Sequence, residues 1–142
     1  MAELNAASQK ILNNNTVSPG YTVPPSTIGQ YIVDAARQRN IDPNVALAVY
    51  RSEGLTHWQS QVVNNGNQER SYGPYQLYTN GGLGNQFEKD TKLNATDPNN
   101  WKQNVDYALN YAANKPDGWR PWNGFQKTEY ASKGYKAGIG QD

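Results

Sequence analysis

The segment from Asp42 to Gly54 constrains the fold most, because it is apolar on almost every side and carries a glutamate at its end. Asp42 supplies a capping oxygen, Pro43 suits the first helical position, and Gly54 can adopt the left-handed conformation that closes a helix. These signals predict a helix from Pro43 to Glu53. A helix that is apolar all round belongs inside a core. The segment therefore predicts a buried helix that delivers one carboxyl group to the edge of that core.

Glu53 is the candidate catalytic residue of this helix. A carboxyl group half out of water has its charged form disfavoured, so its pKa rises and it can hold a proton near neutral pH. Cleavage of a glycosidic bond needs such a general acid. The alternative is a solvated residue at a helix end with Arg51 as its ionic neighbour, and the segment alone leaves both open.

Two further motifs follow along the chain. One is Gly73-Pro-Tyr-Gln76, and the other is Gly118-Trp-Arg-Pro-Trp122. With the helix ending in Glu53, they resemble the lysozyme-like superfamily, namely its SLT-type lytic transglycosylases and phage virion-associated muramidase domains. In that family a helix ends in the catalytic glutamate, a Gly-x-x-Gln segment follows across a loop, and phage-borne members commonly end in Gly-Trp-x-Pro-Trp. The resemblance covers roughly residues 27–125.

The resemblance implies a mainly α fold of the α+β lysozyme-like type, in which a helical domain and a small lobe of loops and a β-hairpin flank a glycan groove. It implies that Glu53 is the general acid, and that the reaction is cleavage of the β-1,4 bond between N-acetylmuramic acid and N-acetylglucosamine in peptidoglycan. Gln76 and its neighbouring backbone would line the groove. The chain departs from the family pattern at Gly54, because most relatives have serine directly after the glutamate. Any role of a serine hydroxyl at this position is therefore in doubt.

The remaining expected substrate-binding residues are Gly73 and four aromatic residues, each with a structural alternative. The chain has 10 Tyr and 4 Trp against 2 Phe, and such rings stack on sugars or serve as ordinary core. Trp58 either floors a sugar subsite or caps the core, and Trp122 either contacts sugar or belongs to a hydrophobic plug. Tyr72 and Tyr75, together with Tyr78, would contact sugar or orient the acid.

A hydrolase also needs a second carboxylate, for which Glu69 is the best candidate because it lies on the loop expected to face Glu53. Glu88 and Asp90 are weaker candidates. The alternative is that Glu69 forms an ordinary exposed pair with Arg70. Lytic transglycosylases work without a second carboxylate, since the C6 hydroxyl of muramic acid attacks and leaves a 1,6-anhydro product. The sequence leaves hydrolase and transglycosylase open.

Length and composition define the domain organisation. A chain of 142 residues is one domain in size, and we expect an N-terminal arm or linker over residues 1–25 and the catalytic domain over residues 26–142. The 13 Lys and Arg nearly balance the 12 Asp and Glu, which argues against nucleic acid as a partner. The chain has no cysteine and His57 is its one histidine, so we expect neither a metal site nor a cofactor.

Residue patterns predict further elements. Apolar residues at helical spacing predict helices over residues 27–40 and 101–115, and shorter helices are expected over 85–91 and around Tyr130. Asn65-Gly66 predicts a tight hairpin turn, and residues 134–140 are expected to form a loose tail. Residues 4–12 can form a short helix that buries little unless it docks on a partner or on the domain.

No apolar run approaches the roughly 18 residues of a membrane span, and the sequence shows no secretory signal. The expected partner is the glycan strand of bacterial peptidoglycan. We expect the protein to be virion-associated, with the N-terminal arm docking on a virion or tail assembly, or to be delivered to the periplasm and cell wall. Host export fits nearly as well. Two alternative functions are a non-catalytic structural or glycan-binding module of a phage tail, and a chitin-cleaving enzyme.

Overall fold

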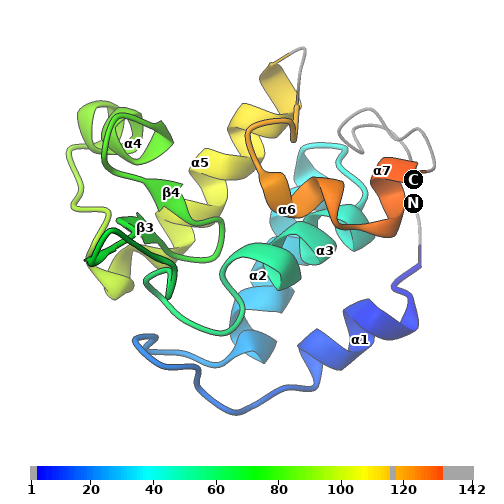
Figure 1. Ribbon diagram of the computed structural model, residues 1–142. Coiled ribbons are helices and arrows are strands. Elements are labelled where there is room, and N and C mark those ends of the chain that lie inside the picture. Colours follow the sequence, from blue (N-terminus) through cyan, green and yellow to red (C-terminus); the bar gives the residue numbers. More distant parts are fainter. Residues whose placement is uncertain (1–2, 116–117, 133–142) are drawn as a thin grey trace.

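The fold is a helical body with two short antiparallel hairpins at one side (Figure 1). It is seen in a computed structural model that describes residues 3–115 and 118–132. The helices are α1 (Ala6–Leu12), α2 (Pro25–Gln38), α3 (Pro43–Glu53), α4 (Leu83–Thr91), α5 (Trp101–Asn114), α6 (Asn123–Gln126) and α7 (Glu129–Ser132), with a 3-10 turn at Pro98–Asn100. The strands are β1 (Val63–Asn64), β2 (Asn67–Gln68), β3 (Ser71–Tyr72) and β4 (Leu77–Tyr78). The expectation of a mainly α chain with a small β part is confirmed. Within the described residues, no helix has the length and apolar character needed to cross a membrane.

Helix α3 has the predicted bounds and lies at the centre of the core. The Asp42 side chain caps it by accepting a hydrogen bond from the Asn44 N–H at 2.9 Å, and Pro43 occupies the first turn. Residues 43–50 are all buried, as expected for a helix that is apolar on every side. Only the last turn, which ends at Glu53, reaches solvent.

Helices α2 and α5 belong to the same helical body as α3. The predicted helix over residues 27–40 is confirmed as α2, but it starts at Pro25 because that proline takes the first helical position. Helix α2 packs against both α3 and α5. The predicted apolar face of α5 is buried. Asn104 is buried on the same face, where it makes specific hydrogen bonds that the apolar pattern does not reveal.

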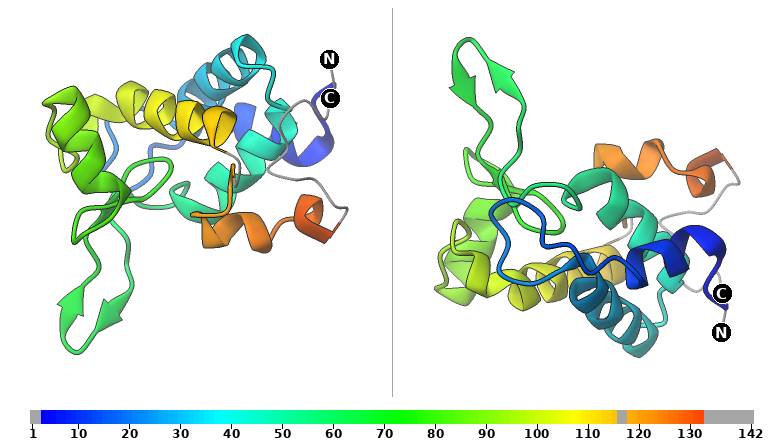
Figure 2. Two further views of the ribbon diagram at one scale, coloured as in Figure 1. Left: turned by 90° about the horizontal axis from the view of Figure 1, so that it is seen from above. Right: turned by 90° about the horizontal axis from the view of Figure 1, so that it is seen from below.

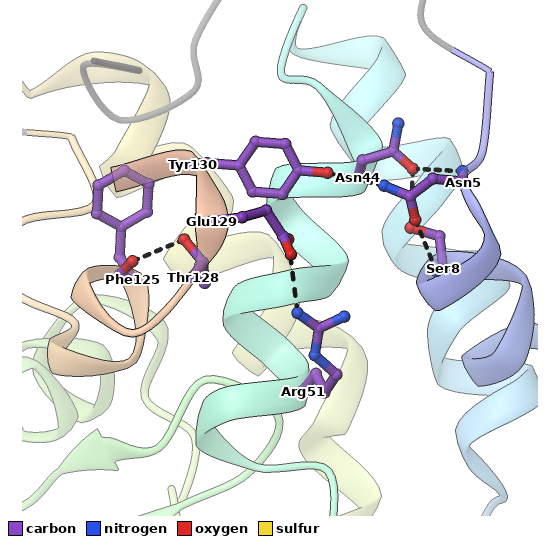
Figure 3. A network of polar contacts seen from close by, with 8 residues as sticks. All are labelled: Asn5, Ser8, Asn44, Arg51, Phe125, Thr128, Glu129 and Tyr130. Carbon is purple, nitrogen blue, oxygen red and sulfur yellow. Dashed lines mark hydrogen bonds and ion pairs between the residues drawn. The ribbon is translucent and has the colours of Figure 1, made fainter. Parts of the chain in front are cut away.

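The N-terminal segment packs against the helical body. Helix α1 contacts α2 and α3, and its Ile11 side chain is only 4% exposed. The Asn44 side-chain oxygen accepts hydrogen bonds from the Asn5 N–H at 2.9 Å and from the Ser8 hydroxyl at 2.8 Å (Figure 3). Further along, the Tyr21 hydroxyl donates to a backbone carbonyl after α3. Residues 3–25 are therefore part of the packed domain rather than a linker, because a few buried side chains anchor an otherwise polar segment.

The two hairpins differ in exposure. The β1–β2 hairpin turns at Asn65 and Gly66, which have φ angles of 52° and 80°, as the Asn-Gly signal predicted. Figure 2 shows this hairpin extending away from the helices. The β3–β4 hairpin lies against α5. There the Asn104 side chain donates to the Tyr72 carbonyl at 2.9 Å and accepts from the Tyr75 N–H at 3.0 Å.

The C-terminal part of the described chain folds back over α3. Trp119, Trp122 and Phe125 are buried, so the Gly-Trp-x-Pro-Trp motif forms a hydrophobic plug, and α6 packs on α3. The predicted short helix around Tyr130 is confirmed as α7. It is held by an ion pair between Arg51 and Glu129, with an N–O distance of 3.6 Å (Figure 3). The tail expected over residues 134–140 lies outside the described residues.

Candidate active site

Glu53 lies where two surface cavities meet. The cavities have volumes of about 400 and 450 Å³, and they share Glu53, Ser60, Val62 and Gln76. Together they are called the cleft. The larger cavity adds residues before the first hairpin, and the smaller one adds residues from β3, β4 and the start of the C-terminal segment. A chain-like ligand in the cleft would therefore pass directly over the Glu53 carboxyl group.

Burial makes this carboxyl group a weak acid. The pKa of Glu53 is raised from 4.5 to about 7, mainly because burial removes solvent from the carboxyl group and to a smaller extent because of the negative charge of Glu69. A hydrogen bond from the Gly124 backbone N–H and the positive charge of Lys127 act in the opposite direction. Glu53 can therefore hold a proton near neutral pH. A proton donor of this kind suits general acid catalysis.

Gly54 closes α3 differently from the prediction. Its φ angle is −117°, so the expected left-handed conformation is wrong. A Cβ atom at this position would lie 2.0 Å from the Gly73 carbonyl oxygen and 2.7 Å from that of Pro74. Glycine is needed because the backbone after Glu53 packs directly on the turn between β3 and β4. This contact also explains why serine, which the resemblance implies after the glutamate, does not fit here.

Gln76 links the loops around the acid. Its side-chain amide donates to the Trp58 carbonyl at 3.0 Å and to the Gly73 carbonyl at 2.9 Å, and the residue lines both cavities. Its φ angle is 46°, in the left-handed region that non-glycine residues rarely occupy. Such backbone strain persists only where the surroundings enforce it, and it gathers at functional sites. Gln76 is thus both a cleft residue and a structural bridge.

Helix α6 covers the other side of Glu53. A Cβ atom at Gly124 would lie 2.9 Å from the Glu53 Cγ and 2.9 Å from the Ser52 Cβ. The absence of a side chain at Gly124 therefore allows its backbone N–H to reach the carboxylate. The sequence motif around Trp122 indicated a plug, but it gave no sign of this donor.

Glu69 lies in the cleft with Glu53, whereas the two weaker carboxylate candidates do not. Glu69 is partly buried and lines the smaller cavity, where its charge acts on Glu53. The Glu88 carboxylate accepts a hydrogen bond from the Ala95 N–H at 2.9 Å, and Asp90 accepts one from a tyrosine hydroxyl at 2.7 Å. Both carboxylates therefore make hydrogen bonds around α4, outside the cleft.

Three of the expected groove aromatics belong to the core. Tyr75 is fully buried, and its hydroxyl donates to the Ala46 carbonyl at 2.7 Å. Trp122 is 3% exposed and donates to the Tyr75 carbonyl at 2.7 Å, and Trp58 is 5% exposed and donates to the Thr96 carbonyl at 3.0 Å. The expectation that these rings line the groove is corrected, because their flat faces pack inside the protein.

The aromatic ring in the cleft is Tyr78. It is 41% exposed and lines the smaller cavity, whereas Tyr72 is half-buried in β3 and is not a cleft residue. Gly73 is buried, with a φ angle of 86°, and a Cβ atom there would lie 2.2 Å from the Asn104 side chain. Gly73 therefore has a packing role. Alternation along β4 could have singled out Tyr78 from the three tyrosines named from the sequence, because the neighbouring Leu77 points into the core.

The cleft also contains the one histidine of the chain and several residues that the sequence did not single out. His57 lines the larger cavity, and its Nδ1 lies 3.3 Å from the Thr56 hydroxyl. Within residues 3–115 and 118–132, no group of three or more His, Cys, Asp or Glu residues is placed to hold a metal ion. The remaining cleft residues outside the predicted set are Ser52, Ser60, Gln61, Val62, Ser71, Pro121, Asn123, Gly124 and Lys127.

No protein-family model, curated protein or solved structure matches the chain. Functional inference therefore depends on the chemistry of the cleft and on the order of the three motifs.

Proposed function

We propose that the protein is a lysozyme-like glycosidase that cleaves the β-1,4 bond between N-acetylmuramic acid and N-acetylglucosamine in bacterial peptidoglycan. The observation that carries the proposal is the Glu53 carboxyl group, which has a pKa of about 7 and lies where the two cavities of the cleft meet. The Gly73–Gln76 turn beside it and the plug motif that brings Gly124 onto it support the same assignment.

In this mechanism Glu53 protonates the bridging oxygen while an oxocarbenium-like state develops on the sugar ring. Two routes then complete the reaction. In a hydrolase, the Glu69 carboxylate stabilises the cation or activates water. In a transglycosylase, the C6 hydroxyl of muramic acid attacks, and Glu53 removes the proton of that hydroxyl. The location of Glu69 in the same cleft favours its participation, so hydrolysis is the first route to test.

The test is the release of soluble fragments from purified cell walls. We expect Glu53→Gln to reduce release by about 10²- to 10⁴-fold, because glutamine cannot donate the proton. Glu69→Gln distinguishes the routes, since it should inactivate a hydrolase and spare a transglycosylase. Mass spectrometry of the fragments gives the same distinction, because a 1,6-anhydro end is lighter than a reducing end by one water.

The matched control is Asp34→Asn, which neutralises an exposed carboxylate on α2 and should leave release unchanged. Equal release by wild type and Glu53→Gln would contradict the proposal. Tight wall binding by the wild-type chain without fragment release would favour a glycan-binding module instead. Such an enzyme works at the cell wall, and detection of the protein in purified virions would test whether a phage carries it there.

A further inference from the structure

Lys127 is a charged cleft residue that the proposed reaction does not use. It directly follows α6, where its backbone N–H donates to the Gly124 carbonyl at 3.2 Å. Its side chain is exposed and lines the smaller cavity together with Glu53, Glu69 and Tyr78. Among the described residues that line this cavity, Lys127 is the only cation.

The Lys127 ammonium group is available to a ligand. Its positive charge acts on Glu53, yet no described carboxylate lies within ion-pair distance of it. By contrast, Arg51 from the neighbouring helix is paired with Glu129. An ammonium group offers three hydrogen-bond donors and no acceptor, so in an open cavity it attracts an anionic group.

Peptidoglycan and chitin differ in the charge that they would bring to this position. Both are β-1,4-linked chains of N-acetylated sugars. Muramic acid additionally carries a lactyl group, which either ends in a free carboxylate or bears a peptide stem with its own carboxylates. An unmodified chain of N-acetylglucosamine carries no charge. A cation beside the scissile bond therefore distinguishes the two polymers, whereas neutral amide and hydroxyl groups treat them alike.

We propose that Lys127 is a specificity-determining residue that binds a carboxylate carried by muramic acid, and that it thereby favours such glycans over uncharged chains of N-acetylglucosamine. This inference rests on the proposed function, because it assumes that the cleft binds a peptidoglycan strand. A second explanation is that Lys127 only balances the charges of Glu53 and Glu69. In that case its removal changes the pH dependence of activity but does not change the preference between ligands.

The experiment measures binding in the Glu53→Gln background, where cleavage of the ligands is expected to be strongly slowed. Calorimetry compares three oligosaccharides of equal length: muramic-acid-containing without peptide, muramic-acid-containing with peptide stems, and N-acetylglucosamine only. We expect Lys127→Met to weaken binding of a carboxylate-bearing ligand by about two- to fivefold and to leave binding of the neutral ligand unchanged. The loss should shrink at high ionic strength. Lys89→Met, which removes an exposed lysine on α4 outside the cleft, is the control and should have no effect.

The pattern of losses identifies the source of the carboxylate. A loss confined to the stem-free ligand points to the lactyl carboxylate, and one confined to the stem-bearing ligand points to the peptide. Equal effects on all three ligands, no effect, or no binding would overturn the inference. Fragment release from walls by the wild-type chain tests the proposed function separately. If the wild-type chain releases fragments but Lys127→Met weakens binding of no carboxylate-bearing ligand, the proposed function stands and the role of Lys127 fails. If Lys127→Met weakens only the binding of carboxylate-bearing ligands but the wild-type chain releases no fragments, the role of Lys127 in binding stands and the proposed function fails.

Discussion

At the residue scale, the proton that Glu53 would donate in the proposed reaction also affects the stability of the fold. In the unfolded chain this carboxyl group ionises near 4.5, whereas in the folded protein it holds its proton up to about pH 7. Between these values the folded state binds more protons than the unfolded state, so stability falls as pH rises and is constant above the window. The loss is at most about 3.5 kcal/mol, since each pKa unit corresponds to about 1.4 kcal/mol.

We therefore expect Glu53→Gln to be about as stable as wild type near pH 4 and more stable near pH 8. Urea unfolding at both pH values measures this difference, and Asp34→Asn should show no such gain. A Glu53→Gln protein that is no more stable than wild type near pH 8 would show that the acid is well solvated.

The activity of the wild type should also fall as pH rises through about 7, where Glu53 loses the proton that it must donate.

At the scale of elements, two glycines set how closely neighbouring segments approach α3. A side chain at Gly54 would meet backbone atoms of the β3–β4 turn, which cannot move independently. A side chain at Gly124 would mainly meet the Glu53 and Ser52 side chains. The first contact therefore determines the packing of the fold, and the second determines the position of the acid.

We expect Gly54→Ser to destabilise the protein by about 1–3 kcal/mol or more, because the backbone must shift to accept a Cβ atom. Gly124→Ala should have a smaller effect on unfolding but should lower the rate of fragment release, since it displaces the Glu53 carboxyl group. Urea unfolding and fragment release, measured for both variants, separate these effects. A Gly54→Ser protein of wild-type stability would contradict the close backbone contact.

At the scale of the whole molecule, the two ends of the described chain meet on α3. Helix α1 reaches Asn44 through Asn5 and Ser8, and the Asn5 side-chain amide also donates to the Tyr130 hydroxyl at 2.8 Å (Figure 3). Helix α7 reaches the same helix through Arg51. The N-terminal segment thus contacts both α3, which carries Glu53, and the C-terminal segment, which covers α3.

We expect Ile11→Ala to destabilise the protein by about 2–5 kcal/mol, because it leaves a cavity where α1 meets the core. Lys10→Ala is the matched control on the exposed face of the same helix and should stay within about 0.5 kcal/mol of wild type. Urea unfolding of both variants measures the difference. Equal stabilities would mean that α1 behaves as the arm that the composition suggested.

Local chemistry in the sequence determined the elements themselves. The capping aspartate and proline defined the start of α3, its apolar residues required burial, and Asn65-Gly66 specified the tight turn. The helical spacing of apolar residues defined α2 and α5. These features depend on neighbours within a few residues, so the sequence alone contains the information.

Only the tertiary structure decided which groups surround Glu53. The identity of an aromatic residue does not reveal whether its ring faces a groove or the core. The packing places Tyr75 in the core and Tyr78 in the cleft. The Gly124 donor and the Lys127 charge come from a segment far along the chain, so no local pattern could place them. The pKa of Glu53 follows from this arrangement, because desolvation and the fields of nearby charges depend on distances in space, which spacing along the chain does not fix.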